Sequence, residues 1–156
     1  MENPSTEALI VSEIGIQPGE TPILAAPVGF KSVWKFKGDR SNYGDCYLWE
    51  PIPPSAEYLA IGHIATMKDH PPSVESVRCV HKNFVKESVP CKLSRKRYPY
   101  LWSSHGSLTS QASAPVSVWL VQPRSDSIWC NTFIVSPGET VPSSSSTVCL
   151  KMAAVQ

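Results

Sequence analysis

Short runs of hydrophobic residues alternate with polar and proline-rich turns along the chain, at a spacing of about eight to twelve residues that is typical of β-sandwiches and barrels. Proline, glycine, serine and asparagine cluster between the runs, where strands need to end. We therefore predict strands at residues 8–16, 29–36, 46–49, 58–67, 74–84, 98–102, 116–121, 128–135 and 147–152. Only residues 80–93 carry a pattern compatible with a helix, and that pattern is weak.

The chain contains an internal echo. Trp34-Lys-Phe-Lys-Gly38 recurs as Trp102-Ser-Ser-His-Gly106, and a second tryptophan follows each copy, at Trp49 and Trp119. Pro18-Gly-Glu-Thr21 recurs as Pro137-Gly-Glu-Thr140. Chance is one explanation and two related β units are the other. We predict an all-β fold, an antiparallel sandwich or β-prism built from two related units at about residues 8–72 and 74–152, within a single domain covering residues 1–156.

The amino-acid composition excludes several classes of protein. Fifteen prolines in 156 residues oppose a helical bundle, because proline breaks helices. With 42% hydrophobic residues and a net charge of +1, the chain lacks the composition of a disordered segment or of a strongly basic nucleic-acid binder. The first residues have neither a basic region nor a long apolar core, so we expect no signal peptide, and the odd count of five cysteines favours reduced, buried thiols in the cytoplasm.

Tryptophans are the first candidates for a binding surface, because they serve both as core anchors and as binding hot spots. Trp129 fits the core, whereas Trp102 follows Tyr98 and Tyr100 in a surface-like aromatic cluster. The turn after Trp34 offers a second kind of candidate, since Asp39, Asn42 and Asp45 present oxygens that either bind calcium or cap their own hairpin loop. The candidate binding residues are thus Trp34, Asp39, Asn42, Asp45, Trp49, Tyr98, Tyr100 and Trp102.

The sequence gives less support to metal binding or catalysis. Cys79, His81 and Cys91 offer soft ligands, but a structural zinc site needs a fourth ligand and a second close pair. No nucleophile elbow, phosphate loop or zinc-protease motif occurs in the sequence. The histidines are read as surface or turn residues. We expect no enzymatic activity, no metal and no cofactor.

Half of the 14 basic residues lie between Arg78 and Arg97, so the neutral total conceals a basic run. This run either contacts anionic lipid headgroups or an acidic protein partner, or is a solvated loop. Nucleic acid is not expected, because the run has no interleaved aromatic residues. Its members are Arg78, Lys82, Lys86, Lys92, Arg95, Lys96 and Arg97.

Residues 29–84 carry a family resemblance. The pattern begins with a glycine, an aromatic residue and a tryptophan, and continues into a turn that contains glycine. An aspartate, a Trp-x-Pro motif, a further proline, an aromatic residue and a glycine follow the turn. In this sequence the positions are Gly29, Phe30, Trp34, Gly38, Asp45, Trp49, Pro51, Pro54, Tyr58 and Gly62. This pattern resembles the signature of the vacuolar protein sorting-associated protein 62 family, and is similar to the adaptor-binding repeats of vacuolar protein sorting 13 proteins. The resemblance implies an all-β module without known catalysis.

Two functional hypotheses follow. The first is a non-enzymatic binding module at a membrane-trafficking interface, cytoplasmic and peripheral on membranes, which recognises a protein or peptide through a sheet edge or loop, with anionic lipid as a further contact. The alternative is a lectin-like or toxin-associated module that targets glycans or membranes through its aromatic loops.

Overall fold

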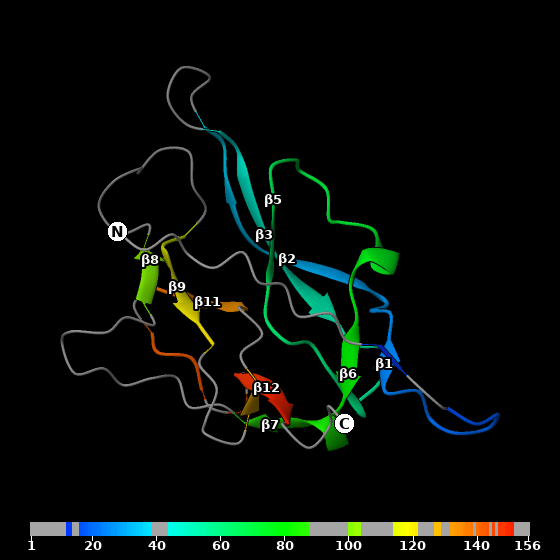
Figure 1. The fold of residues 1–156 in the computed structure, drawn as a ribbon. Helices are drawn as coiled ribbons and strands as arrows, with labels where there is room; N and C mark the ends of the chain where they lie inside the picture. Colours follow the sequence, from blue (N-terminus) through cyan, green and yellow to red (C-terminus); the bar gives the residue numbers. More distant parts are fainter. Residues whose placement is uncertain are drawn as a thin grey trace, which may run out of the picture.

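The computed structural model describes residues 12–13, 16–38, 44–87, 100–103, 114–121, 127–128, 132–138, 140–143, 145 and 147–151. The secondary structure of these residues consists of twelve β-strands and two short 3₁₀ helices, arranged in four three-stranded antiparallel sheets (Figure 1). The prediction of an all-β antiparallel fold is therefore confirmed.

Two of the sheets are larger and resemble each other in detail. One has the order β2 (Gly29–Phe36), β3 (Cys46–Ile52), β5 (Ile64–Thr66), and the other the order β8 (Tyr100–Ser103), β9 (Val116–Leu120), β11 (Phe133–Pro137). The first strand of each contains a register shift just before its tryptophan, at Ser32/Trp34 and at Tyr100/Trp102. The cross-strand partners then match one for one: Trp34↔Leu48 with Trp102↔Val118, and Trp49↔Ile64 with Trp119↔Ile134.

An indole hydrogen bond is repeated as well. Trp49 Nε1 donates to Thr66 Oγ1 at 2.9 Å, and Trp119 Nε1 donates to Ser136 Oγ at 2.8 Å. In both sheets the acceptor lies 17 residues after the tryptophan, on the third strand. Each hydroxyl in turn donates a hydrogen bond to a nearby backbone carbonyl, Thr66 to Lys68 and Ser136 to Thr140. The tryptophan echo in the sequence is therefore a repeated piece of structure.

The two smaller sheets repeat each other in the same way. One has the order β1 (Leu24–Ala25), β6 (Cys79–His81), β4 (Tyr58–Leu59), and the other the order β7 (Val85–Glu87), β12 (Val148–Lys151), β10 (Ser127–Ile128). Ala25 pairs with Cys79 as Lys86 pairs with Cys149, and Leu59 pairs with Val80 as Ile128 pairs with Leu150. Figure 1 shows β6 running beside β1 and β7 beside β12.

We call β1–β6 the first unit and β7–β12 the second unit. The 3₁₀ helix η2 (Lys82–Phe84) connects them. The prediction of two related units is confirmed by these pairings. β6 lies after the predicted division at residues 72–74 but pairs with β1 and β4, so it belongs to the first unit in structure. The outer limits of the predicted units stay a prediction.

Both units contribute to two of the hydrophobic cores among the described residues, whereas a third cluster, Val121, Ile134 and Cys149, belongs to the second unit alone. Between the larger sheets, Trp34, Phe36 and Leu48 pack with residues of the second unit, namely Val116, Val118 and Val135. Between the smaller sheets, Val80 packs with Val85, Val148 and Leu150. Because these two cores draw side chains from both units, much of the apolar burial that stabilises one unit depends on the other.

Several predicted strands differ from the observed ones. Residues 58–67 form β4 and β5 in two different sheets, because Gly62 adopts a φ of +93° between them and turns the chain. Residues 74–84 form η1 (Val74–Ser76), β6 and η2 rather than one strand. β3 continues through Pro51, beyond the predicted end at Trp49, since β5 pairs only with Tyr47–Trp49 and the proline borders a strand on one side.

Two further differences concern the ends of strands and the weak helical pattern. Residues 80–87 are strand and 3₁₀ helix, so the weak helical pattern at 80–93 forms no α-helix over that part. Residues 128–135 are divided between β10 and β11. Most of the strand predicted at residues 8–16 lies outside the described residues, and Ile16 is not in a strand.

Candidate functional site

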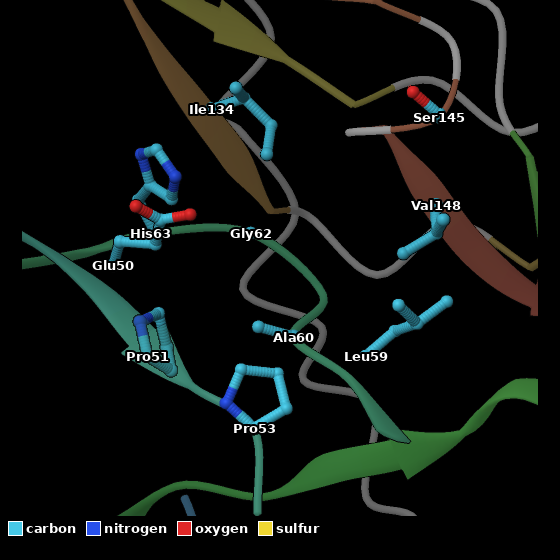
Figure 2. Close-up of a pocket in the computed structure, with 10 residues that line it drawn as sticks. All are labelled: Glu50, Pro51, Pro53, Leu59, Ala60, Gly62, His63, Ile134, Ser145 and Val148. Carbon is cyan, nitrogen blue, oxygen red and sulfur yellow. The ribbon is translucent and has the colours of Figure 1, made fainter. Parts of the chain in front are cut away.

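A small cavity of about 180 Å³ lies between the two units (Figure 2). The first unit contributes seven of its lining residues, from β3, the residue after it, β4 and the segment that leads into β5. The second contributes Ile134, Val148 and Ser145, which precedes β12. We call it the seam cavity, and its lining is Glu50, Pro51, Pro53, Leu59, Ala60, Gly62, His63, Ile134, Ser145 and Val148.

The backbone of Gly62 and His63 forms the contact between the units beside the cavity. A Cβ atom on Gly62 would lie 2.8 Å from Thr132 Cβ and 2.9 Å from the Phe133 carbonyl oxygen, so only glycine fits there. The next residue, His63, donates its backbone N–H to the Phe133 oxygen at 2.7 Å. The close approach of the two chains at this point therefore depends on glycine.

The His63 ring makes a second link across the same contact. Its Nδ1 accepts the backbone N–H of Val135 at 3.0 Å, and since a backbone amide always donates, this nitrogen carries no proton. Burial lowers the pKa of His63 below its ordinary value of 6.5; the Glu50 carboxylate opposes this shift and Lys31 adds to it. The ring is accordingly neutral at pH 7, with its proton on Nε2.

Glu50 provides the charge at the cavity. Its side chain is 44% exposed and pairs with Lys31 on the neighbouring strand, with 3.2 Å between Nζ and Oε2. Figure 2 shows the Glu50 carboxylate and the His63 ring together on one side of the cavity, and Leu59 and Val148 on the other. The cavity therefore has Glu50 and His63 at one end, and the rest of its lining is apolar except for Ser145.

The reason for the cavity becomes visible when the units are compared. In the second unit the backbone N–H of Val121 donates to the Thr132 oxygen at 2.9 Å and extends the β9–β11 ladder. The equivalent residue in the first unit is Pro51, which has no N–H to donate. The ladder between β3 and β5 ends earlier as a result, and Pro51 and Gly62 line the space that is left.

The size and chemistry of the cavity limit its ligands. It is smaller than the roughly 300–1,000 Å³ of pockets that enclose drug-sized molecules. It suits one amino-acid side chain or a group of similar size, held by apolar contacts and oriented by one or two polar atoms.

Trp34 and Trp49, both predicted as binding residues, lie in the core. Their exposed fractions are 3% and 6%, and Trp34 stacks on Phe36 at 6.0 Å between ring centroids. These two tryptophans anchor the first unit's larger sheet, which is the other role that the sequence left open for them.

Asp45 is exposed and both of its carboxylate oxygens are occupied within its own hairpin. Oδ1 accepts the backbone N–H of Gly38 at 3.0 Å, and Oδ2 accepts the Tyr47 hydroxyl at 3.2 Å. This is the behaviour of a loop-capping residue. Asp39 and Asn42 lie outside the described residues.

The aromatic cluster is described only in part. Tyr100 and Trp102 lie on β8, where they pair with Trp119 and Val118, and Tyr98 lies outside the described residues. Their role as binding residues stays a prediction.

The beginning of the basic run is neutralised by neighbouring acids. Lys82 Nζ lies 2.7 Å from Glu57 Oε1, and this hydrogen bond lowers the pKa of Glu57 below its ordinary 4.5. Arg78 lies 3.5 Å from Glu75 and also donates to backbone carbonyls. Lys86 lies on β7. The remaining members, Lys92, Arg95, Lys96 and Arg97, lie outside the described residues.

Cysteines and histidines show no shared site in the described part of the chain. Cys46 and Cys79 have free thiols, and Cys79 is buried, while Cys91 and Cys130 lie outside the described residues. His81 Nδ1 accepts the backbone N–H of Asn83 at 3.3 Å and caps η2. Among the described residues, no three His, Cys, Asp or Glu side chains converge as metal ligands.

Sequence reasoning missed Glu50 and His63, and it treated the histidines as surface or turn residues. His63 is instead partly buried and bonded across the units. One signal was available: when the two units are aligned on their tryptophans, Glu50 and His63 fall opposite Leu120 and Phe133. A polar pair in place of an apolar pair marks a departure from the repeat.

Comparisons with known proteins agree with the resemblance seen in the sequence. A family model described as vacuolar protein sorting-associated protein 62 matches residues 5–156. No curated protein matches the chain. Among solved structures, the chain is similar to GNIP1Aa from Chromobacterium piscinae, with a TM-score of 0.61 and 24% identity over 84% of this chain. It spans 25% of the length of that protein, and the likeness concerns the fold.

Proposed function

Since the chain belongs to the vacuolar protein sorting-associated protein 62 family, we propose that it is a non-enzymatic binding module that holds one side chain of a protein or peptide partner in the seam cavity. The observation that carries this proposal is the cavity itself, an apolar space between two units with two polar side chains at one end. Pockets of this form, with few and well-placed polar groups, are typical of recognition sites.

The surroundings of the cavity support recognition of an exposed segment. Ile52 and Val28, which are 42% and 68% exposed, lie close to the cavity at the end of the larger sheet, where the Val28 N–H donates to the Ile52 oxygen. Next to them, Pro51 and Pro53 form the cavity wall. A peptide that inserts one side chain would find apolar surface beside it for its neighbours.

The family description supports a role at membrane-trafficking interfaces on the cytoplasmic side. None of the described helices has the length or the apolar composition to span a membrane. The ion pairs of Arg78 and Lys82 reduce the positive charge available to lipid, so we propose a protein or peptide as the primary partner, with anionic lipid and glycan as the competing ligands.

The test begins with peptides selected from a random display library on the whole chain. Their affinity is then measured by calorimetry for the wild type and for Ala60→Phe, which places a ring in the cavity. Ala65→Phe is the matched control, because Ala65 is exposed on β5 and does not line the cavity. We expect Ala60→Phe to lose binding at least tenfold, about 1.4 kcal/mol, and Ala65→Phe to keep it.

Equal binding by both variants would contradict the cavity as the binding site. Anionic vesicles and a glycan array are tested with the same proteins. If no selected peptide depends on Ala60, and vesicles or glycans bind equally well to the wild type and to Ala60→Phe, the lipid or the glycan alternative would replace the proposal.

A further inference from the structure

The charge on the seam cavity selects among the side chains that would fit. Of its ten lining residues, Glu50 alone carries a formal charge at pH 7, because His63 is neutral with its Nδ1 accepting from Val135. The rest of the lining offers proline rings, aliphatic side chains, a glycine and the Ser145 hydroxyl. A ligand that matches this lining has an aliphatic body and a positively charged end.

Resting on the proposed function, we propose that the side chain accepted by the seam cavity is basic, an arginine or a lysine of the partner. Its methylene stem packs against Leu59, Val148 and Pro53, and its charged group pairs with the Glu50 carboxylate. Long basic side chains behave in this way elsewhere, with the stem on apolar surface and the charge at a polar or solvated end. Arginine also matches the two carboxylate oxygens with paired donors.

The competing classes of side chain fit less well. An acidic side chain would bring a second negative charge to Glu50, which is destabilising at short range. A leucine or isoleucine would fill the apolar part and leave the carboxylate without any contribution to binding. Charge complementarity therefore favours a basic side chain over both.

Lys31 is the internal competitor for Glu50. It lies directly opposite Glu50 on β2, and its side chain is 71% exposed. An exposed pair of this kind contributes little free energy, so a ligand displaces Lys31 at small cost. Removal of Lys31 is consequently expected to strengthen the binding of a cation, a direction that general damage to the fold would not produce.

A matched control lies on the same strand. Lys35 pairs with Asp69 at 2.8 Å and does not line the cavity. Lys31→Ala and Lys35→Ala each remove one exposed positive charge from β2, so a general effect of net charge would be the same in both. Only Lys31→Ala releases Glu50.

The experiment uses the whole chain and four probes, the N-acetyl amides of arginine, lysine, leucine and glutamate, titrated by NMR with the amide signals of Ala60, His63 and Ile134 as readout. We expect arginine and lysine to bind more tightly than leucine, and glutamate not to bind. Glu50→Gln should weaken arginine binding about tenfold. Lys31→Ala should strengthen it about two- to fivefold, and Lys35→Ala should leave it unchanged.

The possible outcomes distinguish failure of the preference for a basic side chain from failure of the proposed binding function. Leucine binding as tightly as arginine, or arginine binding that is insensitive to both Glu50→Gln and Lys31→Ala, would overturn the basic side chain and leave the cavity as a binding site. No signal change with any probe, together with peptides that ignore Ala60→Phe, would overturn both.

Discussion

The two units share their strand order, register and indole hydrogen bonds, yet they differ where they meet. Leu120 and Phe133 face each other across β9 and β11 in the second unit, and the equivalent places in the first unit hold Glu50 and His63. Val121 extends the ladder in the second unit, whereas Pro51 ends it in the first. The repeated positions build the fold, and the positions that differ, Glu50, Pro51, Gly62 and His63, give the cavity its polar end and its space.

This difference between the units indicates how a repeated fold can acquire a cavity that only one unit shapes. Buried Cys79 and Cys149 occupy equivalent places, as Trp49 and Trp119 do, because two equivalent sets of sheets need similar packing. A proline, a glycine with positive φ, a carboxylate and an imidazole depart from the repeat within one short stretch of strands β3 and β5 and the segment between them. The predictions below test whether the repeated and the unrepeated positions carry these separate roles.

The largest effect is expected at Gly62. Gly62→Ala meets Thr132 and the Phe133 carbonyl at under 3.0 Å and also takes an unfavourable φ of +93°, so we expect a loss of about 3 kcal/mol in the free energy of unfolding. Gly19→Ala has the same sign of φ, +95°, with no neighbour within 4 Å, and should lose only about 1 kcal/mol. Urea denaturation measures both, and equal losses would show that the contact between the units is loose.

The repeated indole bonds should give matched, intermediate effects. Thr66→Val and Ser136→Ala each remove the hydroxyl that accepts a tryptophan N–H, and each should cost about 1–2 kcal/mol. Thr66→Ser keeps the hydroxyl and should cost less. A large loss in one unit with none in the other, measured by urea denaturation, would break the equivalence of the units.

The smallest effect is a pH dependence that only the first unit supplies. Because burial lowers the pKa of His63 from 6.5, the unfolded chain binds the proton more tightly, and the stability from neutral His63 is complete above pH 6.5 and declines as the pH falls. One proton limits this decline to about 1.4 kcal/mol per pH unit. His63→Asn keeps an acceptor and does not titrate.

Stability measured between pH 7 and pH 5 should therefore fall more steeply for the wild type than for His63→Asn. Parallel profiles would mean that folding does not lower the pKa of His63, and would contradict this prediction. Glu57, whose pKa lies below 4.5, acts at lower pH and does not interfere in this range.

Much of the fold could be predicted from the sequence. The strand at residues 29–36 coincides with β2, and the tryptophan echo identifies the two larger sheets, because Trp and its neighbours are the residues that such sheets must bury. The division of residues 58–67 between two sheets could not be predicted, since an apolar run with one glycine fits a continuous strand equally well. The positive φ of Gly62 is a tertiary requirement, set by the approach of Thr132.

Much less of the candidate site could be predicted. Charge density along the sequence drew attention to Arg78 and Lys82, but their acidic partners lie outside the basic run. Glu75 is three residues before Arg78, and Glu57 is 25 residues from Lys82 and reaches it only through the fold. Trp34 and Trp49 were candidates by residue type, and their burial depends on how the sheets pack. Glu50 lies on β3 and His63 lies just before β5, and the two become neighbours only when these segments are placed together.

The first and last strands of each unit are neighbours, since β1 pairs with β6 and β7 pairs with β12. A unit that begins and ends at the same place can be copied in tandem through a connector as short as η2, without moving the strands inside it. The same property makes each unit a natural subject for circular permutation, because its original ends can be joined by a short loop. Gene duplication is thus a simple origin for this architecture, with the seam cavity as a difference that arose in one copy.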